Sequence, residues 1–106
     1  MVEYAAKRDP KRCPTHPGAL LREVIPATGK RKAEIAALLG ISRQRLYDIL
    51  KERKPVSAAV AVRLGKLFGD GAGVWVRMQG AHDTWRAERE LAGEIKKIPT
   101  LKGVAA

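Results

Sequence analysis

Three side chains at the start of one predicted helix have the types and the spacing that read the edges of DNA bases. Arg43, Gln44 and Tyr47 share one face of the stretch 43–50, because residues three and four apart lie on the same side of a helix. Arginine can bond bidentately to guanine and glutamine to adenine, each pair contributing roughly 1–3 kcal/mol of discrimination against the wrong base. These three residues are therefore predicted to read bases.

The stretch 30–54 has the spacing of two short helices joined by a tight turn. Gly40 can take the positive φ that ends the first helix, and Ser42 can cap the second by accepting a backbone N–H. Apolar residues form the inner faces of both helices and fill the turn; they are Ile35, Ala36, Leu39, Ile41, Leu46, Ile49 and Leu50. This order predicts a DNA-binding helix-turn-helix.

Positive charge is concentrated on the same stretch. The chain carries a net charge of +10, and residues 30–54 hold eight Lys or Arg against three Asp or Glu, which is half of the excess. Such a field attracts polyanions through counterion release, although a basic chain can also be merely a soluble one. The cations at 30–32 oppose the dipole at the start of a helix, so a bound phosphate explains them better than folding does. The predicted backbone contacts are Lys30, Arg31, Lys32, Ser42, Lys51, Arg53 and Lys54.

The flanking sequence predicts packing helices and an all-α fold. One helix opens at Thr15 or His16, with Pro17 in its first turn, and ends at Pro26 and Gly29; Arg22 on its outer side is expected to be a solvated charge. Another runs from the Ser57 cap to residue 68 and buries an apolar stripe. Runs with the period-two alternation of a strand are absent, so no sheet is expected in the central part.

The last long helix, residues 72–91, carries a heavy apolar load for so small a protein. Its apolar positions recur at the spacing of a helix packed against another helix, with Trp75 and His82 beside the seam. Closure of the protomer's own core explains some of these side chains, and a two-fold partner suits the remainder, since tryptophan is enriched at interfaces. The predicted dimer residues are Val74, Trp75, Met78, His82 and Trp85.

The residues that could bind a metal or catalyse a reaction are few. Cys13 and His16 form a C-x-x-H pair, but His82 is the other histidine and two ligands do not make a zinc site. No nucleophile with a base, phosphate loop or acidic pair is apparent, so the sequence predicts no metal, no cofactor and no enzymatic activity.

Length and hydropathy predict one domain. We expect a flexible basic arm at residues 1–14, a helix-turn-helix domain with a C-terminal dimerisation helix at 15–92, and a tail at 93–106. Neither a long apolar run nor the apolar core of a signal peptide is present, which predicts a cytoplasmic protein without membrane contact.

Several segments in order resemble the HigA-type antitoxins of the XRE, or lambda-repressor-like, helix-turn-helix superfamily. The resemblance covers about residues 16–86 and rests on HPGALLREVIPATGK, AEIAALLGISRQRLYDIL, PVSAAVAVRLGKLFG and GVWVRMQGAHD. Trp75, Gln79 and Asp83 match the family's last-helix motif, whereas His82 stands where a tyrosine is common. Lys-Glu-Arg-Lys after the recognition helix departs from the usual Asn-Gly type of turn.

The resemblance implies a five-helix fold and a homodimer bound to a palindromic operator in its own promoter. It also implies a partner, a small basic HigB/RelE-like toxin that cleaves messenger RNA, which the antitoxin of this type II module neutralises. Two alternatives stay open: a stand-alone XRE-family transcriptional regulator without a toxin, and a protein-interaction module that does not bind DNA. An adjacent reading frame for a short basic toxin-like protein would favour the antitoxin over the stand-alone regulator, and its absence would count against the antitoxin.

Overall fold

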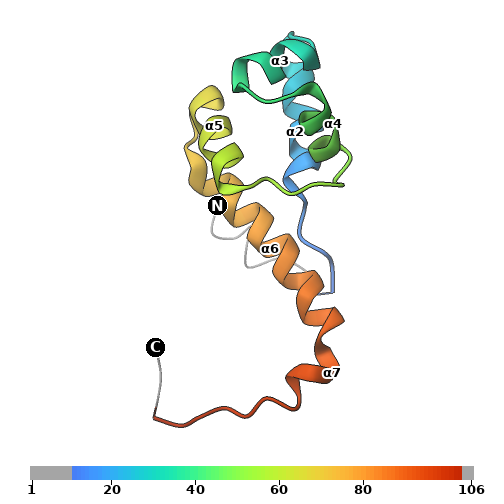
Figure 1. Cartoon of the computed structure of the whole chain (residues 1–106), viewed down its shortest axis with the longest axis vertical. Coiled ribbons are helices and arrows are strands. Elements are labelled where there is room, and N and C mark those ends of the chain that lie inside the picture. Colours follow the sequence, from blue (N-terminus) through green and yellow to red (C-terminus); the bar gives the residue numbers. More distant parts are fainter. Residues whose placement is uncertain (1–10, 104–106) are drawn as a thin grey trace.

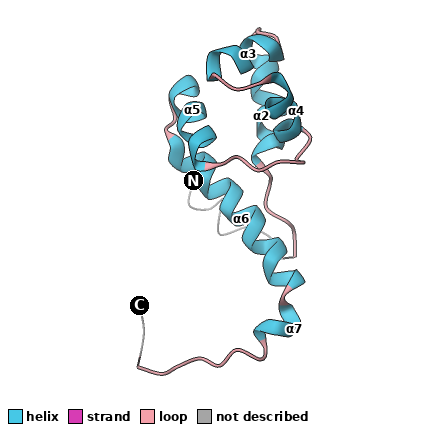
Figure 2. Ribbon diagram, viewed as in Figure 1, coloured by secondary structure: helices cyan, strands magenta, loops and turns pink. Residues whose placement is uncertain are grey.

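The computed structural model describes residues 11–103, which contain six helices and no strand. The N-terminal part of the predicted arm, residues 1–10, lies outside this range. Helices α2 (Pro17–Ala27), α3 (Lys32–Leu39), α4 (Arg43–Leu50) and α5 (Ala58–Phe68) form the body of the molecule (Figure 1). Helix α6 (Ala72–Glu90) runs from the body outward, and the short α7 (Ala92–Ile95) lies beyond it. Figure 2 shows the loops that connect them, and the all-α prediction is confirmed.

Helix α2 starts as predicted and ends slightly later. His16 is its N-cap, with Nδ1 accepting the Gly18 N–H at 2.9 Å, and Pro17 occupies the first position, where its missing N–H costs nothing. The helix continues through Pro26 to Ala27 rather than stopping before the proline. A proline so near the end removes one helical hydrogen bond without breaking the helix.

The helix-turn-helix forms through local contacts that the sequence encodes. Gly40 takes φ 73° after α3, and the Ile41 N–H bonds to the Ala36 carbonyl at 3.1 Å, which closes the end of that helix as a Schellman turn. Ser42 then caps α4 by accepting the Arg45 N–H at 3.0 Å. The predicted turn at Gly40 and the predicted cap at Ser42 are confirmed.

One core joins all the helices from α2 to α6. Helices α5 and α6 make the most extensive contact of the molecule, and Gly65 allows it because an added Cβ would overlap the backbone carbonyl of Gly71. The buried apolar residues are Leu21, Ile25, Ile35, Ala36, Leu39, Leu46, Ile49, Leu50, Val56, Val60, Ala61, Leu64 and Trp75.

Candidate nucleic-acid interface

The predicted reading residues lie together on the outer face of α4. Arg43 and Gln44 are exposed in its first turn, and Tyr47 follows one turn later with 37% of its surface exposed. Nε2 of Gln44 donates to Oδ1 of Asp48 at 3.0 Å. An amide nitrogen carries two protons, so this bond orients the Gln44 amide and leaves one N–H and the oxygen free for a base.

The start of α3 brings three predicted phosphate contacts beside this face. Lys30, Arg31 and Lys32 are exposed, and Nζ of Lys32 lies 5.9 Å from the centre of the Tyr47 ring. Oε1 of Glu34 accepts the Arg31 N–H at 3.0 Å, and this backbone hydrogen bond is the main cause that lowers the pKa of Glu34. The N-terminal end of α3 therefore carries one carboxylate, which the helix dipole favours, and three cations, which it disfavours.

An open hollow separates these cations from the end of α2. Its volume is about 480 Å³, and its lining is more apolar than polar. The residues around it are Ile25, Pro26, Lys30, Arg31, Lys32, Ala33 and Tyr47. The hollow is continuous with the reading face through Tyr47 and with the α3 N-terminus through its three cations.

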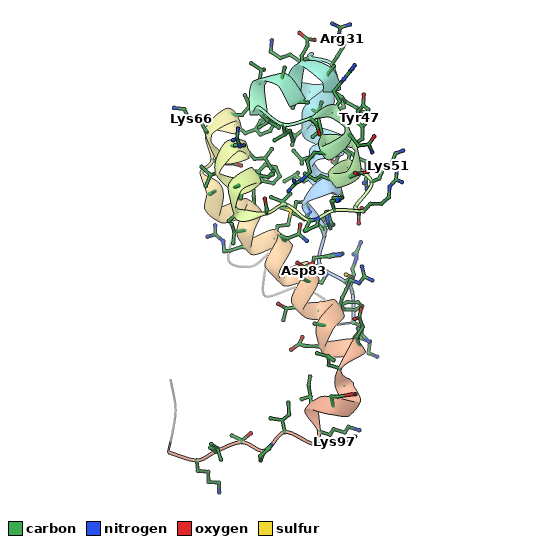
Figure 3. All side chains as sticks on the ribbon, in the orientation of Figure 1. Arg31, Tyr47, Lys51, Lys66, Asp83 and Lys97 are labelled. Carbon is green, nitrogen blue, oxygen red and sulfur yellow. The ribbon has the colours of Figure 1, made fainter. Side chains whose placement is uncertain are left out.

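The second group of cations lies in the loop that follows α4. Lys51, Arg53 and Lys54 are exposed, and the N–H groups of residues 53 and 54 both donate to the Asp48 carbonyl. Glu52 takes φ 61°, which turns the chain sharply at this point. Figure 3 places Arg31, Tyr47 and Lys51 along one side of the body, with Lys66 on the opposite side. The two cation groups therefore flank the reading face.

Ser42 has a different place from the lysines and arginines. Its hydroxyl is engaged in capping α4, so the hydroxyl serves the helix end first. Its backbone stands at the N-terminus of α4, where the dipole attracts an anion. For that reason Ser42 remains among the residues proposed to contact DNA phosphates.

Two arginines from the packing helices hold the two helices of the helix-turn-helix, a role that the sequence did not predict. Arg22 of α2 donates through Nη1 to the carbonyl oxygen of Leu50, and through Nη2 to Oε2 of Glu52 at 3.0 Å. Arg22 is thus not merely a solvated charge. Arg63 of α5 donates to the carbonyl oxygen of Leu39 at 2.8 Å, just before the turn of the helix-turn-helix.

Arg45 was also missed by the sequence analysis. It points from α4 toward the cap of α5, with Nη2 3.5 Å from the Ser57 hydroxyl. Its Nε is buried and has no hydrogen-bond acceptor within residues 11–103. A basic residue three positions from the cap of a short helix gives no sequence signal that it faces the next helix.

Helix α6 divides the predicted dimer residues into two groups. Trp75 is only 1% exposed, packs at 6.2 Å from the Phe68 ring, and donates from Nε1 to Asp70 at 3.1 Å. The core of the protomer therefore accounts for Trp75 without a partner, since α5 already covers the indole. Val74 is half-buried and also packs on the core.

The second group lies farther along α6. Met78 and Trp85 are half-buried there, and the Arg89 guanidinium lies 4.0 Å from the centre of the Trp85 ring.

His82 is half-buried and contacts the chain just before α2. Its Nδ1 donates to the Pro14 carbonyl at 2.9 Å and lies 3.4 Å from Sγ of Cys13, while its ring stands edge-on to His16 at 5.0 Å. The C-x-x-H pair in the sequence is thus not the pair formed in space. Among residues 11–103, no three His, Cys, Asp or Glu side chains gather in a way that could hold a metal ion.

The geometry is that of a helix-turn-helix DNA-binding protein: an exposed recognition helix between two groups of cations. No protein-family model matches the chain. An HTH-type transcriptional regulator of Escherichia coli K12, YbaQ, is 30% identical over 93 residues, which cover 85% of this chain and 82% of YbaQ.

Two solved structures are similar to this chain in fold and in sequence. An addiction module antidote of the HigA family from Coxiella burnetii has a TM-score of 0.75 at 30% identity, covering 85% of this chain and 99% of the other. The antitoxin GraA in complex with its operator has a TM-score of 0.75 at 32% identity, covering 93% and 98%. The chain belongs to the HigA family of addiction module antidotes, a family of DNA-binding regulators rather than enzymes.

No helix within the described range is both long and apolar enough to span a membrane.

Proposed function

We propose that this protein binds a palindromic operator as a homodimer and represses its own operon as the antitoxin of a type II module. The observation that supports this most directly is the arrangement on one side of the body. Arg43, Gln44 and Tyr47 face outward from α4, with one cation group before α3 and another after α4. The same fold in GraA was solved with its operator, which supports DNA as the ligand.

Each group has a distinct role in the proposed complex. The first turns of α4 enter the major groove, where Arg43 reads a guanine, Gln44 an adenine, and Tyr47 a further base edge. Asp48 presets the Gln44 amide for the bidentate contact. The cations contact phosphates on either side and fix the register without reading sequence; they are Lys30, Arg31, Lys32, Lys51, Arg53 and Lys54, with the backbone at Ser42.

The proposed dimer uses the outer part of α6, which the rest of the protomer covers only in part. Met78, His82 and Trp85 are half-buried there, and exposed Leu91 and Ile95 continue beyond them. Val74 lies at the edge of this face. A two-fold related copy would place two α4 helices on successive half-sites of a palindrome.

The proposed partner is a small basic HigB/RelE-like toxin encoded beside this gene. The HigA family membership supports it, and the antidote from Coxiella burnetii is described as part of an addiction module. The alternative, a stand-alone regulator, is favoured by the likeness to YbaQ, which is described as a transcriptional regulator. Co-expression with the neighbouring gene, scored by growth rescue and co-purification, separates the two.

The DNA-binding proposal is tested by a salt series of binding measurements on the protein's own promoter fragment. Gln44→Ala should relax sequence preference, because it removes a base contact and leaves the phosphate contacts in place. Lys32→Ala should weaken binding to all duplexes alike and flatten the logarithmic salt slope by about 0.9. The reverse pattern would refute these roles, and failure to bind the promoter at low salt would refute the function.

A further inference from the structure

The loop between α4 and α5 is held at both ends by side chains from helices that carry none of the proposed DNA contacts. At its start, Arg22 of α2 donates to the Leu50 carbonyl and to Glu52. At its end, Oε1 of Gln79 of α6 accepts the Val56 N–H at 2.8 Å. The exposed cations of the loop lie between these two attachments: Lys51, Arg53 and Lys54.

Gln79 is a buried amide with both of its polar atoms engaged. It is 6% exposed, and its Nε2 donates to Oδ1 of Asp83 at 2.9 Å, one turn farther along α6. That bond turns the amide so that its oxygen, and not its nitrogen, meets the Val56 N–H. Val56 is itself 4% exposed, so water cannot replace the acceptor if Gln79 is removed.

We propose that Gln79, oriented by Asp83, is a positioning residue for DNA binding that acts through the α4–α5 loop. It holds the loop where Lys51, Arg53 and Lys54 reach the phosphates, and touches no DNA itself. This inference rests on the proposed function, which assigns the phosphate contacts to that loop. It gives α6 a part in operator binding that is separate from dimerisation.

The expected signature follows from where the effect is transmitted. Gln79→Met keeps the bulk and removes the acceptor, so the end of the loop is released while α4 keeps its contact with Arg22 and α3 keeps its contact with Arg63. Affinity should fall at least tenfold for promoter and scrambled duplexes alike. The salt slope should decrease by about 0.9 for each phosphate that the loop no longer neutralises, with sequence preference unchanged.

A double-mutant cycle tests whether the loop transmits the effect. The full-length chain is titrated onto both duplexes across a salt series as wild type, Gln79→Met, the loop variant K51A/R53A/K54A, and their combination. In the loop-variant background, Gln79→Met should weaken binding no further, because the side chains that it positions are already absent. Additive effects on affinity, or a wild-type salt slope in Gln79→Met, would overturn the inference.

A polarity swap supplies the matched control. In Q79E/D83N a carboxylate oxygen at position 79 still accepts the Val56 N–H, and the new amide at position 83 donates to that carboxylate. Both hydrogen bonds survive, and only the one between positions 79 and 83 has its donor reversed. Binding and salt slope should return to within about threefold of wild type. A swap variant that binds as weakly as Gln79→Met would count against the hydrogen bond as the cause.

Asp83→Ala keeps the inference testable if Gln79→Met does not fold. Asp83 is exposed, so its removal should leave the thermal melt by circular dichroism little changed while weakening DNA binding by about threefold with the same salt signature. Wild-type binding by Asp83→Ala would contradict the orienting role.

The loop variant distinguishes a failure of the loop's proposed phosphate contacts from a failure of the positioning role of Gln79. If K51A/R53A/K54A binds like wild type, the phosphate role of the loop fails and this inference fails with it. If the loop variant binds weakly with a reduced slope while Gln79→Met and Asp83→Ala bind normally, the proposed function stands and only the positioning role is refuted.

Discussion

The two halves of α6 belong to one continuous helix but have opposite surroundings. In residues 72–79, Trp75 and Gln79 are buried against α5 and the α4–α5 loop, whereas none of residues 80–103 is buried. The outer half still carries Trp85, and the exposed side chains of Leu91 and Ile95 follow just after the helix. The inner half therefore serves the core of the protomer, whereas the outer half lies beyond that core and is the part proposed to meet a second copy.

The largest effect should come from the inner half. Trp75→Ala removes a fully buried indole and its hydrogen bond to Asp70, so the free energy of unfolding should fall by about 3–5 kcal/mol. Chemical denaturation monitored by circular dichroism measures this. Trp75→Phe is the control: it keeps an aromatic ring against Phe68, loses the N–H and part of the ring volume, and should cost clearly less.

The next effect concerns the outer half and the proposed dimer. Trp85→Ala should weaken self-association by at least tenfold, about 1.4 kcal/mol or more, because a half-buried tryptophan on an interface is a candidate hot spot. Sedimentation equilibrium over a range of concentrations measures this. Equal self-association of Trp85→Ala and wild type would remove Trp85 from the interface.

His16 lies where α2 begins beside the outer half of α6, and it should make stability depend on pH. Burial, and then the charge of His82, lower the pKa of His16 below its ordinary value of 6.5. The unfolded chain therefore binds a proton more readily, so stability is full above about pH 6.5 and declines as the pH falls through the folded-state pKa. Glu52 and Asp83 oppose this shift, and Arg22 adds to it.

Protonation would also remove the acceptor that caps α2, since Nδ1 of His16 receives the Gly18 N–H. His16→Asn keeps a capping oxygen and does not titrate, so thermal melts from pH 7.5 to 5 should lose most of the pH dependence seen in wild type. His16→Ala should cost about 1 kcal/mol at neutral pH because the cap is removed. An unchanged pH profile in His16→Asn would rule out this histidine as the source.

The smallest effect should come from the end of the described chain. Ile98 is 68% exposed, so Ile98→Ser should change the free energy of unfolding by less than about 0.5 kcal/mol. A larger decrease at protein concentrations that favour the dimer, absent on dilution, would extend the proposed interface to this segment.

The sequence was sufficient for the features that depend on neighbours in the chain. Gly40 and Ser42 mark the turn because a positive φ and a cap are local requirements, and the apolar spacing of α3 and α4 follows from the helical period. The exposed face of α4, with Arg43, Gln44 and Tyr47, follows from the same period. These elements were predicted with nearly the observed bounds.

The features that the sequence did not predict depend on how helices cross. Arg22 and Arg63 look like surface charges until the packing of α2 and α5 places their side chains beside backbone carbonyls at the ends of α4 and α3. Trp75 and Trp85 share a helix and a residue type, and the apolar period cannot say how far along the helix α5 extends. Cys13 is near His16 in sequence, but it is His82, far along the chain, that its sulfur contacts.

The length of α6 also sets a distance. A helix rises about 1.5 Å per residue, so the six residues from Gln79 to Trp85 span about 9 Å. In the proposed dimer this rigid segment links the point where the loop beside α4 is anchored to the point where two copies meet. Its length therefore sets the distance between the two recognition helices of that dimer. Inserting one helical turn between these positions would alter the spacing of half-sites that the protein prefers, without changing any residue that touches DNA.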